Sequence, residues 1–311
     1  MGIVRLEFLF VVLWSTGFIG AKYGLPYAGP FTLLFIRYAL VVLLLFAWLS
    51  YRRELRLSNR MEIARSALIG LLAHAIWLSA VFGAIALGVS PWIVALITAL
   101  QPMATSVLSG PLLRERVSLL QWVGMVVGLV GVVLVVGTKI GLQTDVSWVG
   151  YALPFVATIS MTLATLYQRH LNRGQPGQTL PIIPSLFVQA TTSTIALFPL
   201  AFFFEGFQVQ WTGQLVFAIA WFVVVLSIGA YGLMLKLLEH RTAARVSSLM
   251  YLTPPVTLLL GFLAFGDALS WGDAIGLGIT ALGVGLVYQG ETAEISELRS
   301  DRSNNLRGMM S

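Results

Sequence analysis

The chain has 311 residues, of which 58% are hydrophobic and only 10% are charged. Its mean hydropathy of +0.87 excludes a water-soluble globular protein and indicates an integral membrane protein. The lack of cysteine excludes disulfides, thiol catalysis and thiolate metal sites, while the net charge of +6 must be explained by where the basic residues lie.

Apolar runs of about 20 residues, the length of a helix that crosses a hydrocarbon core of about 30 Å, recur along almost the whole chain. The first run shows no small-x-small cleavage site, so we expect it to be retained as a span. The sequence therefore predicts an all-α integral membrane protein with ten transmembrane helices, at 5–24, 30–49, 64–86, 91–112, 118–137, 147–168, 181–204, 212–237, 243–265 and 270–289.

The placement of the basic residues predicts the topology. Sixteen of the nineteen Lys and Arg residues lie at the start of the first span, in or beside the connections that follow even-numbered spans, or in the polar segment 291–311. Because positive loops mark the cytoplasmic side, we expect both termini in the cytoplasm and a loosely ordered cytoplasmic tail over 291–311. The positive charge then needs no nucleic-acid partner, and we expect the protein to contact the lipid bilayer instead.

The chain contains an internal repeat. At a constant offset of 152 residues, LQPMATSVLSGPLLRERVSLLQWVGMVVGLVGVVLV from Leu100 aligns without a gap with LTPPVTLLLGFLAFGDALSWGDAIGLGITALGVGLV from Leu252. Each copy holds five spans, and because five is odd the second copy must cross the membrane in the opposite direction. The sequence thus predicts two inverted five-helix repeats, at 1–140 and 145–290, an architecture typical of secondary transporters.

These stretches resemble the repeat of the drug/metabolite transporter (DMT) superfamily, in particular its EamA-type members. The resemblance rests on a proline in the fourth span, an acidic residue after it and a glycine-rich fifth span, and on the opening LWSTGFIGAKYGLPYAGPFTLLFIRYAL; it covers residues 5–289. It implies a ten-helix inner-membrane carrier, commonly an exporter of metabolites such as amino acids. Asp267 stands where a glutamate is more usual, which leaves the substrate open.

Several alternatives to an amino-acid exporter remain. Within the superfamily, the substrate is a sugar phosphate or a drug. From another class, an intramembrane enzyme would need a nucleophile–base pair or metal ligands inside the spans, and the sequence has neither. We therefore expect a small-molecule substrate, no catalytic residues, no metal and no cofactor.

Arg37 is a permanent cation inside the second predicted span. It lies roughly 10 Å deep at 1.5 Å per residue, and an arginine at a helix centre costs about 2.5–3.5 kcal/mol on insertion scales. No Asp or Glu lies in the interior of any predicted span. Either Arg37 binds the carboxylate of a substrate, or it cross-links helix ends by bonding backbone carbonyls.

Other candidate substrate-binding residues lie in the first, third and eighth spans. His74 is the one histidine inside a predicted span, and Trp77 shares its helix face. His74 either bonds a substrate or carries a coupling proton, or it is a neutral histidine bonded to a neighbouring helix. Trp14 and Tyr231 are further candidates for the wall of a cavity.

Pro102 and Pro254 are predicted to break corresponding helices, and each frees a backbone carbonyl one turn earlier. Paired breaks in the two halves point to a binding site. Gln101 and Thr253 would place polar groups beside these carbonyls. The alternative is that the prolines only shape helix packing.

Small and polar residues also recur at helical spacing. Polar stripes on the sixth and seventh spans either line a pathway or bond neighbouring helices; the seventh-span stripe is Ser185, Gln189 and Thr192. Glycines on the fifth and tenth spans predict close packing, of the two spans on each other or across a homodimer: Gly124, Gly128, Gly131, Gly276, Gly278, Gly283 and Gly285.

Overall fold

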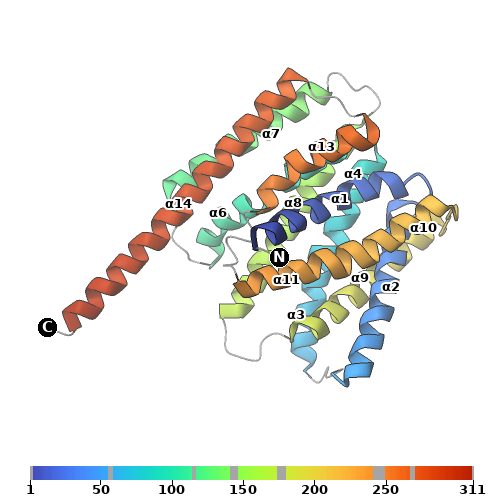
Figure 1. Ribbon diagram of the computed structural model, residues 1–311, viewed down its shortest axis with the longest axis horizontal. Helices are drawn as coiled ribbons and strands as arrows, with labels where there is room; N and C mark the ends of the chain where they lie inside the picture. Colours follow the sequence, from blue (N-terminus) through green and yellow to red (C-terminus); the bar gives the residue numbers. More distant parts are fainter. Residues whose placement is uncertain are drawn as a thin grey trace.

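The computed structural model is a bundle of helices (Figure 1) and describes residues 3–54, 59–113, 117–140, 146–173, 180–240, 249–266 and 270–309. Within these residues the only extended pairing is an isolated antiparallel bridge between Ala28 and Val209. Some charged residues used to predict the topology lie outside the described part: Arg56, Arg114, Glu115, Arg116, Asp145, Arg241, Arg245 and Asp267.

The first half of the chain supplies the helices of the first five predicted spans. The third span is one continuous run in which the π-helical segment η1 separates α3 from α4, and the fourth is divided into α5 and α6. The elements are α1 (Ile3–Gly24), α2 (Pro30–Arg52), α3 (Arg60–Gly70), η1 (Leu71–Ile76), α4 (Trp77–Ala86), α5 (Pro91–Thr98), α6 (Gln101–Leu113) and α7 (Leu119–Ile140).

The second half repeats this plan. The eighth span again contains a π-helical segment, η2, and the ninth begins with a 3₁₀ turn, η3. The elements are α8 (Trp148–Arg173), α9 (Ile182–Glu205), α10 (Gly213–Ala220), η2 (Trp221–Ala230), α11 (Tyr231–His240), η3 (Leu249–Leu252), α13 (Thr253–Phe265) and α14 (Trp271–Met309).

The helices have the lengths and composition of membrane spans. Among the described residues, 8 helical stretches are long and apolar enough to cross a bilayer. Two shorter apolar helices, Leu119–Val135 and Thr253–Phe265, coincide with the predicted fifth and ninth spans. The prediction of an all-α multi-pass membrane protein is confirmed.

The C-terminal segment differs from the prediction. Helix α14 does not end with the predicted tenth span but continues to Met309 and projects from the bundle (Figure 1). The expectation of a loosely ordered tail from residue 291 is therefore wrong. The physical reason is local: the segment is rich in Glu, Ser and Arg and has no proline, so no residue in it forces the helix to stop.

Helices that hold the same position in the two halves pack against each other in opposite directions. Helix α2 packs along α9, its equivalent in the second repeat. Their rings meet in antiparallel order, since Phe31 contacts Phe204 near one end and Phe46 contacts Phe187 near the other. The second helices of the two repeats therefore run in opposite directions, as inverted repeats require.

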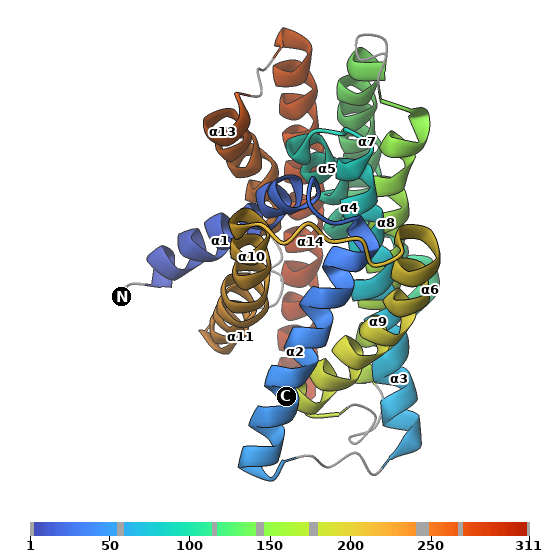
Figure 2. The same ribbon diagram turned by 90° about the vertical axis from the view of Figure 1, so that its right-hand side faces the viewer.

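Helices α7 and α14 form a second pair of this kind and lie side by side at the edge of the bundle (Figures 1 and 2). Gly124 faces Gly283, and Gly131 faces Gly276, at distances at which a single Cβ atom would strike the opposing backbone. The glycines at these positions thus allow close contact within one chain, so they are not free for a homodimer. Gly278 has open space around it, contrary to its predicted packing role, and so does Gly285.

The first turns of α7 and α14 repeat the same capping arrangement. The backbone N–H of Ser118 donates to Gln121 Oε1 (2.7 Å), and that of Gln121 donates to Ser118 Oγ (3.3 Å). The N–H of Ser270 donates to Asp273 Oδ2 (2.8 Å), and that of Asp273 donates to Ser270 Oγ (3.3 Å). The repeat thus extends to individual hydrogen bonds at two helix starts.

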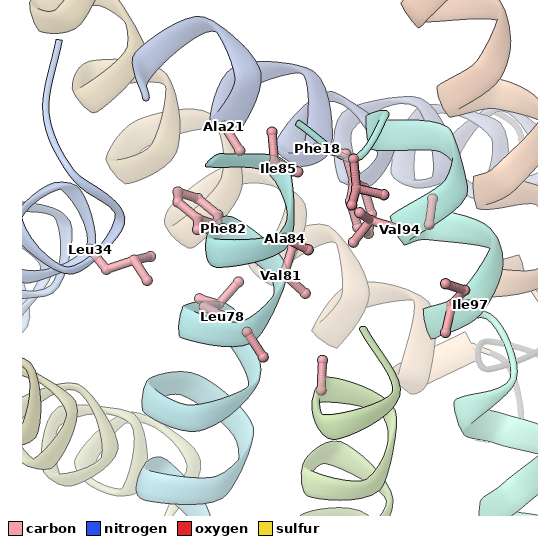
Figure 3. Close-up of a cluster of buried hydrophobic side chains, with 14 of the residues drawn as sticks. Phe18, Ala21, Leu34, Leu78, Val81, Phe82, Ala84, Ile85, Val94 and Ile97 are labelled. Atoms are coloured by element: carbon pink, nitrogen blue, oxygen red, sulfur yellow. The ribbon is translucent and has the colours of Figure 1, made fainter. Parts of the chain in front are cut away.

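We call the end of the bundle at which α2, α5 and α10 begin the outer end, after the predicted topology, and the opposite end the inner end. At the outer end, Glu205 accepts hydrogen bonds from the backbone N–H groups of Phe31 (2.9 Å) and Thr32 (2.7 Å). A carboxylate at the positive start of α2 is a favourable pairing, and it ties α9 to α2. In the interior of the bundle, apolar side chains from α1, α2, α4 and α5 are packed together (Figure 3).

Replacing Gly283 with Ala is expected to destabilise the protein by about 1–3 kcal/mol, because the new Cβ would overlap the backbone of Gly124 and Gly128. The matched control is Gly278→Ala on the same helix, where the new methyl group meets nothing within 4 Å. Thermal unfolding in detergent checks this. Equal melting temperatures for the two variants would show that α7 and α14 do not pack as described.

Candidate functional site

Arg37 on α2 reaches the second repeat. Its Nε and Nη2 atoms lie 3.4 Å and 3.3 Å from Ser227 Oγ in η2. The guanidinium carbon is 5.5 Å from the centre of the Tyr38 ring and 5.3 Å from that of Phe222, which suits cation–π attraction. The Ser227 hydroxyl donates to the Phe222 carbonyl (3.0 Å), so its oxygen accepts from Arg37.

These contacts leave the charge of Arg37 weakly compensated. In the described part of the chain, no carboxylate pairs with it, and its hydrogen bonds go to one hydroxyl rather than to backbone carbonyls. Two long bonds to one oxygen satisfy only part of a guanidinium that has five N–H donors. The arrangement can therefore accept an anionic group without breaking an ion pair.

His74 lies in η1 and is bonded to the second repeat as well. Its Nε2 is 3.0 Å from Gln189 Oε1 on α9, while Gln189 Nε2 donates to Ser185 Oγ (3.0 Å). Ser185 in turn lies 3.2 Å from Ser66 Oγ on α3. Because Gln189 Oε1 can only accept, this geometry assigns the proton to Nε2 of His74. The polar stripe of the seventh span thus bonds a neighbouring helix.

Tyr38 connects these two contacts. Its buried ring packs against the His74 ring, with centres 5.5 Å apart, and lies beside the guanidinium of Arg37. Tyr231, the first residue of α11, follows Ser227 by four residues, about one turn along the same helical run. We call Arg37, Tyr38, His74 and Tyr231 the central cluster.

Aromatic side chains extend the site toward α1. Trp14 on α1 and Trp77 on α4 are stacked, with ring centres 6.4 Å apart and planes inclined by 27°. Trp14 also contacts Phe10, at 5.7 Å. Both tryptophans are half-buried, so the pair offers a flat apolar wall between the first and third helices of the first repeat.

The paired helix breaks lie elsewhere. Helix α5 ends at Thr98, and Pro102 is the second residue of α6, where proline is tolerated. Gln101 bonds Thr105 (3.0 Å) and, on α8, Thr165 (3.2 Å). These bonds link the two repeats at the break.

The corresponding break in the second repeat lies between η3 and α13, which begins with Thr253 and Pro254. Thr253 is buried, and its hydroxyl has no hydrogen-bond partner among the described residues. No described hydrogen bond joins Gln101 or Thr253 to the central cluster. The structure thus brings together Arg37, Tyr38 and His74, pairs Trp14 with Trp77, and shows no hydrogen bond between these residues and the two breaks in its described part.

Sequence reasoning missed Ser227, Tyr38 and the specific role of Gln189. Ser227 and Tyr38 are ordinary span residues, and only the contact across the repeats gives them a role. A signal for Gln189 was present, however. Carrying the offset of 152 residues back into the second span aligns Gln189 with Arg37.

A hollow of about 680 Å³ lies at the outer end, between the connection Leu25–Gly29 and the connection Phe204–Gln210. Its lining includes Glu205 and none of the candidate substrate-binding residues. It therefore belongs to the outer surface and not to the central cluster.

The comparison with protein families identifies the functional class of the protein. The description "EamA-like transporter family" applies to two matched segments, residues 2–137 and 148–289. The chain belongs to the EamA-like transporter family. This EamA-family protein is a membrane transporter and not an enzyme, and its two matched segments agree with the two inverted halves of the structure.

Named relatives of this EamA-family transporter cover nearly its whole length. The inner membrane transporter YedA of Escherichia coli, itself uncharacterized, is 26% identical over 288 residues, 91% of this chain and 90% of the relative. A probable amino-acid metabolite efflux pump of Salmonella typhimurium is 22% identical over 310 residues, 97% of this chain and 98% of the relative. A solved crystal structure matches with a TM-score of 0.63 at 19% identity, covering 94% of this chain and 98% of that one, which supports the fold alone.

If Arg37 serves to bind a ligand and not to stabilise the fold, Arg37→Met should raise the free energy of unfolding by about 1–3 kcal/mol. The substitution removes a charge whose insertion into the membrane is costly. Arg52→Met is the matched control: Arg52 is half-exposed at the inner end of the same helix and pairs with Glu54 at 3.5 Å. Its melting temperature should stay near that of the wild type. A marked loss of stability in Arg37→Met would instead show that the guanidinium is a structural cross-link.

Proposed function

We propose that this transporter exports a small metabolite that carries a carboxylate, such as an amino acid, by alternating access. The observation that carries the proposal is the guanidinium of Arg37, which lies between the two repeats with a single hydroxyl as its hydrogen-bond partner in the described part of the chain. A carboxylate can form two parallel hydrogen bonds with such a group, a stronger pairing than the one it replaces.

The surroundings of Arg37 suit the rest of an amino acid. Tyr38 and Tyr231 bring hydroxyl groups to the same region, while the Trp14–Trp77 pair gives an apolar surface for a side chain. The name of the Salmonella relative, a probable amino-acid metabolite efflux pump, points to the same substrate class. Within the superfamily, sugar phosphates and drugs are the alternatives.

Charge favours a carboxylate over these alternatives. A phosphate group with up to two negative charges is usually held by several cations, whereas the described interior of the spans offers Arg37 alone. A cationic drug would be repelled by the positive charge of Arg37.

With no carboxylate in the predicted spans, a coupling proton would have to use His74 or the substrate itself.

The location in the cell is also part of the proposal. The one-sided distribution of basic residues supports cytoplasmic termini, and the relative YedA is named an inner membrane transporter. We place this chain in the inner membrane, with the outer end of the bundle facing away from the cytoplasm.

Flux of labelled solutes in proteoliposomes tests the proposal. The panel contains amino acids, organic acids and sugar phosphates, and wild type is compared with Arg37→Met and Arg52→Met. We expect at least one carboxylate solute to move, with a loss of about tenfold or more in Arg37→Met, because a charge-assisted hydrogen bond contributes about 1.5–3 kcal/mol. Arg52→Met should keep the wild-type rate. Equal rates in Arg37→Met and wild type would exclude Arg37 as the carboxylate site, and movement of sugar phosphates alone would favour the alternative.

A further inference from the structure

Arg37 and Gln189 occupy the same position in the two repeats. They are 152 residues apart, each about two turns from the start of its helix, Arg37 on α2 and Gln189 on α9. Each side chain crosses to the opposite repeat: Arg37 bonds Ser227 in η2, and Gln189 bonds His74 in η1. The two contacts thus join equivalent segments, but their partners differ by one position, since Ser227 corresponds to Ala75, the residue after His74. One contact uses a charge and the other an amide.

The segments that receive these side chains are also equivalent. Moved by 152 residues, η1 (Leu71–Ile76) falls on 223–228, which lies inside η2 (Trp221–Ala230). A π-helix is rare, occurs mostly as a short interruption of an α-helix, and is frequent at functional sites. Its appearance at the same place in both halves points to a shared role.

Each π-helical segment is held by two helices of the other repeat. Besides its contact with α9, η1 accepts a hydrogen bond at the Leu72 carbonyl from Ser160 Oγ on α8 (2.7 Å). Besides its contact with α2, η2 donates from Trp221 Nε1 to Thr16 Oγ1 on α1 (2.9 Å). The first and second helices of one repeat thus hold the third helix of the other, in both directions.

The side chains that cross between the repeats start at different depths. Because α2 begins at the outer end and α9 at the inner end, Arg37 lies nearer the outer end and Gln189 nearer the inner end, while their partners Ser227 and His74 lie near the middle of their helical runs. The two π-helical segments are thus held from opposite ends of the bundle, one by α2 and the other by α9. This is the arrangement that a carrier with alternating access needs.

We propose that the Arg37–Ser227 and His74–Gln189 contacts are two latches, which close the outer and the inner end respectively and open in alternation. The inference rests on the proposed transport function. It adds a coupling: a carboxylate that takes the guanidinium from Ser227 releases the outer latch. A substrate that arrives from the inner end thereby favours opening toward the outside, the direction of export.

The protein contains no cysteine, so single cysteines can report the opening of each end without background. Leu49→Cys on α2 reports the inner end, and Ala201→Cys on α9 reports the outer end. The two positions are equivalent in the repeats, and in the present structure both side chains are buried, at 0% exposure. The measured quantity is the rate of reaction with a membrane-impermeant maleimide in nanodiscs, without substrate.

Opening one latch should change the two rates in opposite directions. Ser227→Ala is expected to raise the rate at Ala201→Cys about fivefold and to lower the rate at Leu49→Cys, because losing one hydrogen bond shifts the equilibrium by about that factor. Gln189→Leu should give the reverse pattern. Ser227→Thr, which keeps the hydroxyl, should retain the wild-type pattern.

Matched controls remove hydroxyl groups that bond only their own helix. Ser15→Ala and Thr194→Val lose bonds to the Val11 and Ala190 carbonyls and should leave both rates unchanged. If Gln189→Leu does not purify as a folded protein, His74→Leu tests the same latch. Rates that rise together, or that do not move, would overturn the proposal. Reciprocal shifts in a protein that carries no solute of the panel would support the latches and reject the proposed substrate class.

Discussion

The rest of the structure depends on one constraint: helices at the same position in the two repeats pack antiparallel against each other. In a bilayer, backbone groups bond within their own helices, so the halves must be joined by close packing and by a few side-chain bonds. Glycine contacts join α7 to α14, and aromatic contacts together with the Glu205 cap join α2 to α9. Helix positions that meet across the repeats then recur in the other half, even where the side chains at those positions differ.

This symmetry explains why the polar centre of the bundle has two parts. Arg37 and Gln189 are equivalent by position, and both reach a π-helical segment of the other repeat. They differ in charge, however, and the difference breaks the symmetry where a substrate would bind. One half holds a guanidinium and the other an amide at the same position, so the two halves differ chemically where their third helices are held.

The sequence was sufficient for the architecture and only partly for the site. Hydropathy located the spans and the 152-residue register predicted the inverted halves, because both depend on local composition. The glycine prediction was right for Gly276 but wrong for Gly278, which lies about 200° further round the helix at 3.6 residues per turn. The π-helical segments and the role of Ser227 were not predicted, since both depend on contacts between residues far apart in the chain.

The opposite orientation of the two halves is tested most directly at two equivalent positions, Leu119 at the start of α7 and Trp271 at the start of α14. The question is from which side of the membrane each position can be reached. Both side chains are exposed, at 79% and 87%. In the cysteine-free chain, single cysteines at these sites can be labelled with a membrane-impermeant maleimide in intact cells and in inverted vesicles. Two halves that cross the membrane in opposite directions predict labelling of Trp271→Cys from outside and of Leu119→Cys from the cytoplasmic side. Labelling of both from one side would contradict the inverted repeat and everything derived from it.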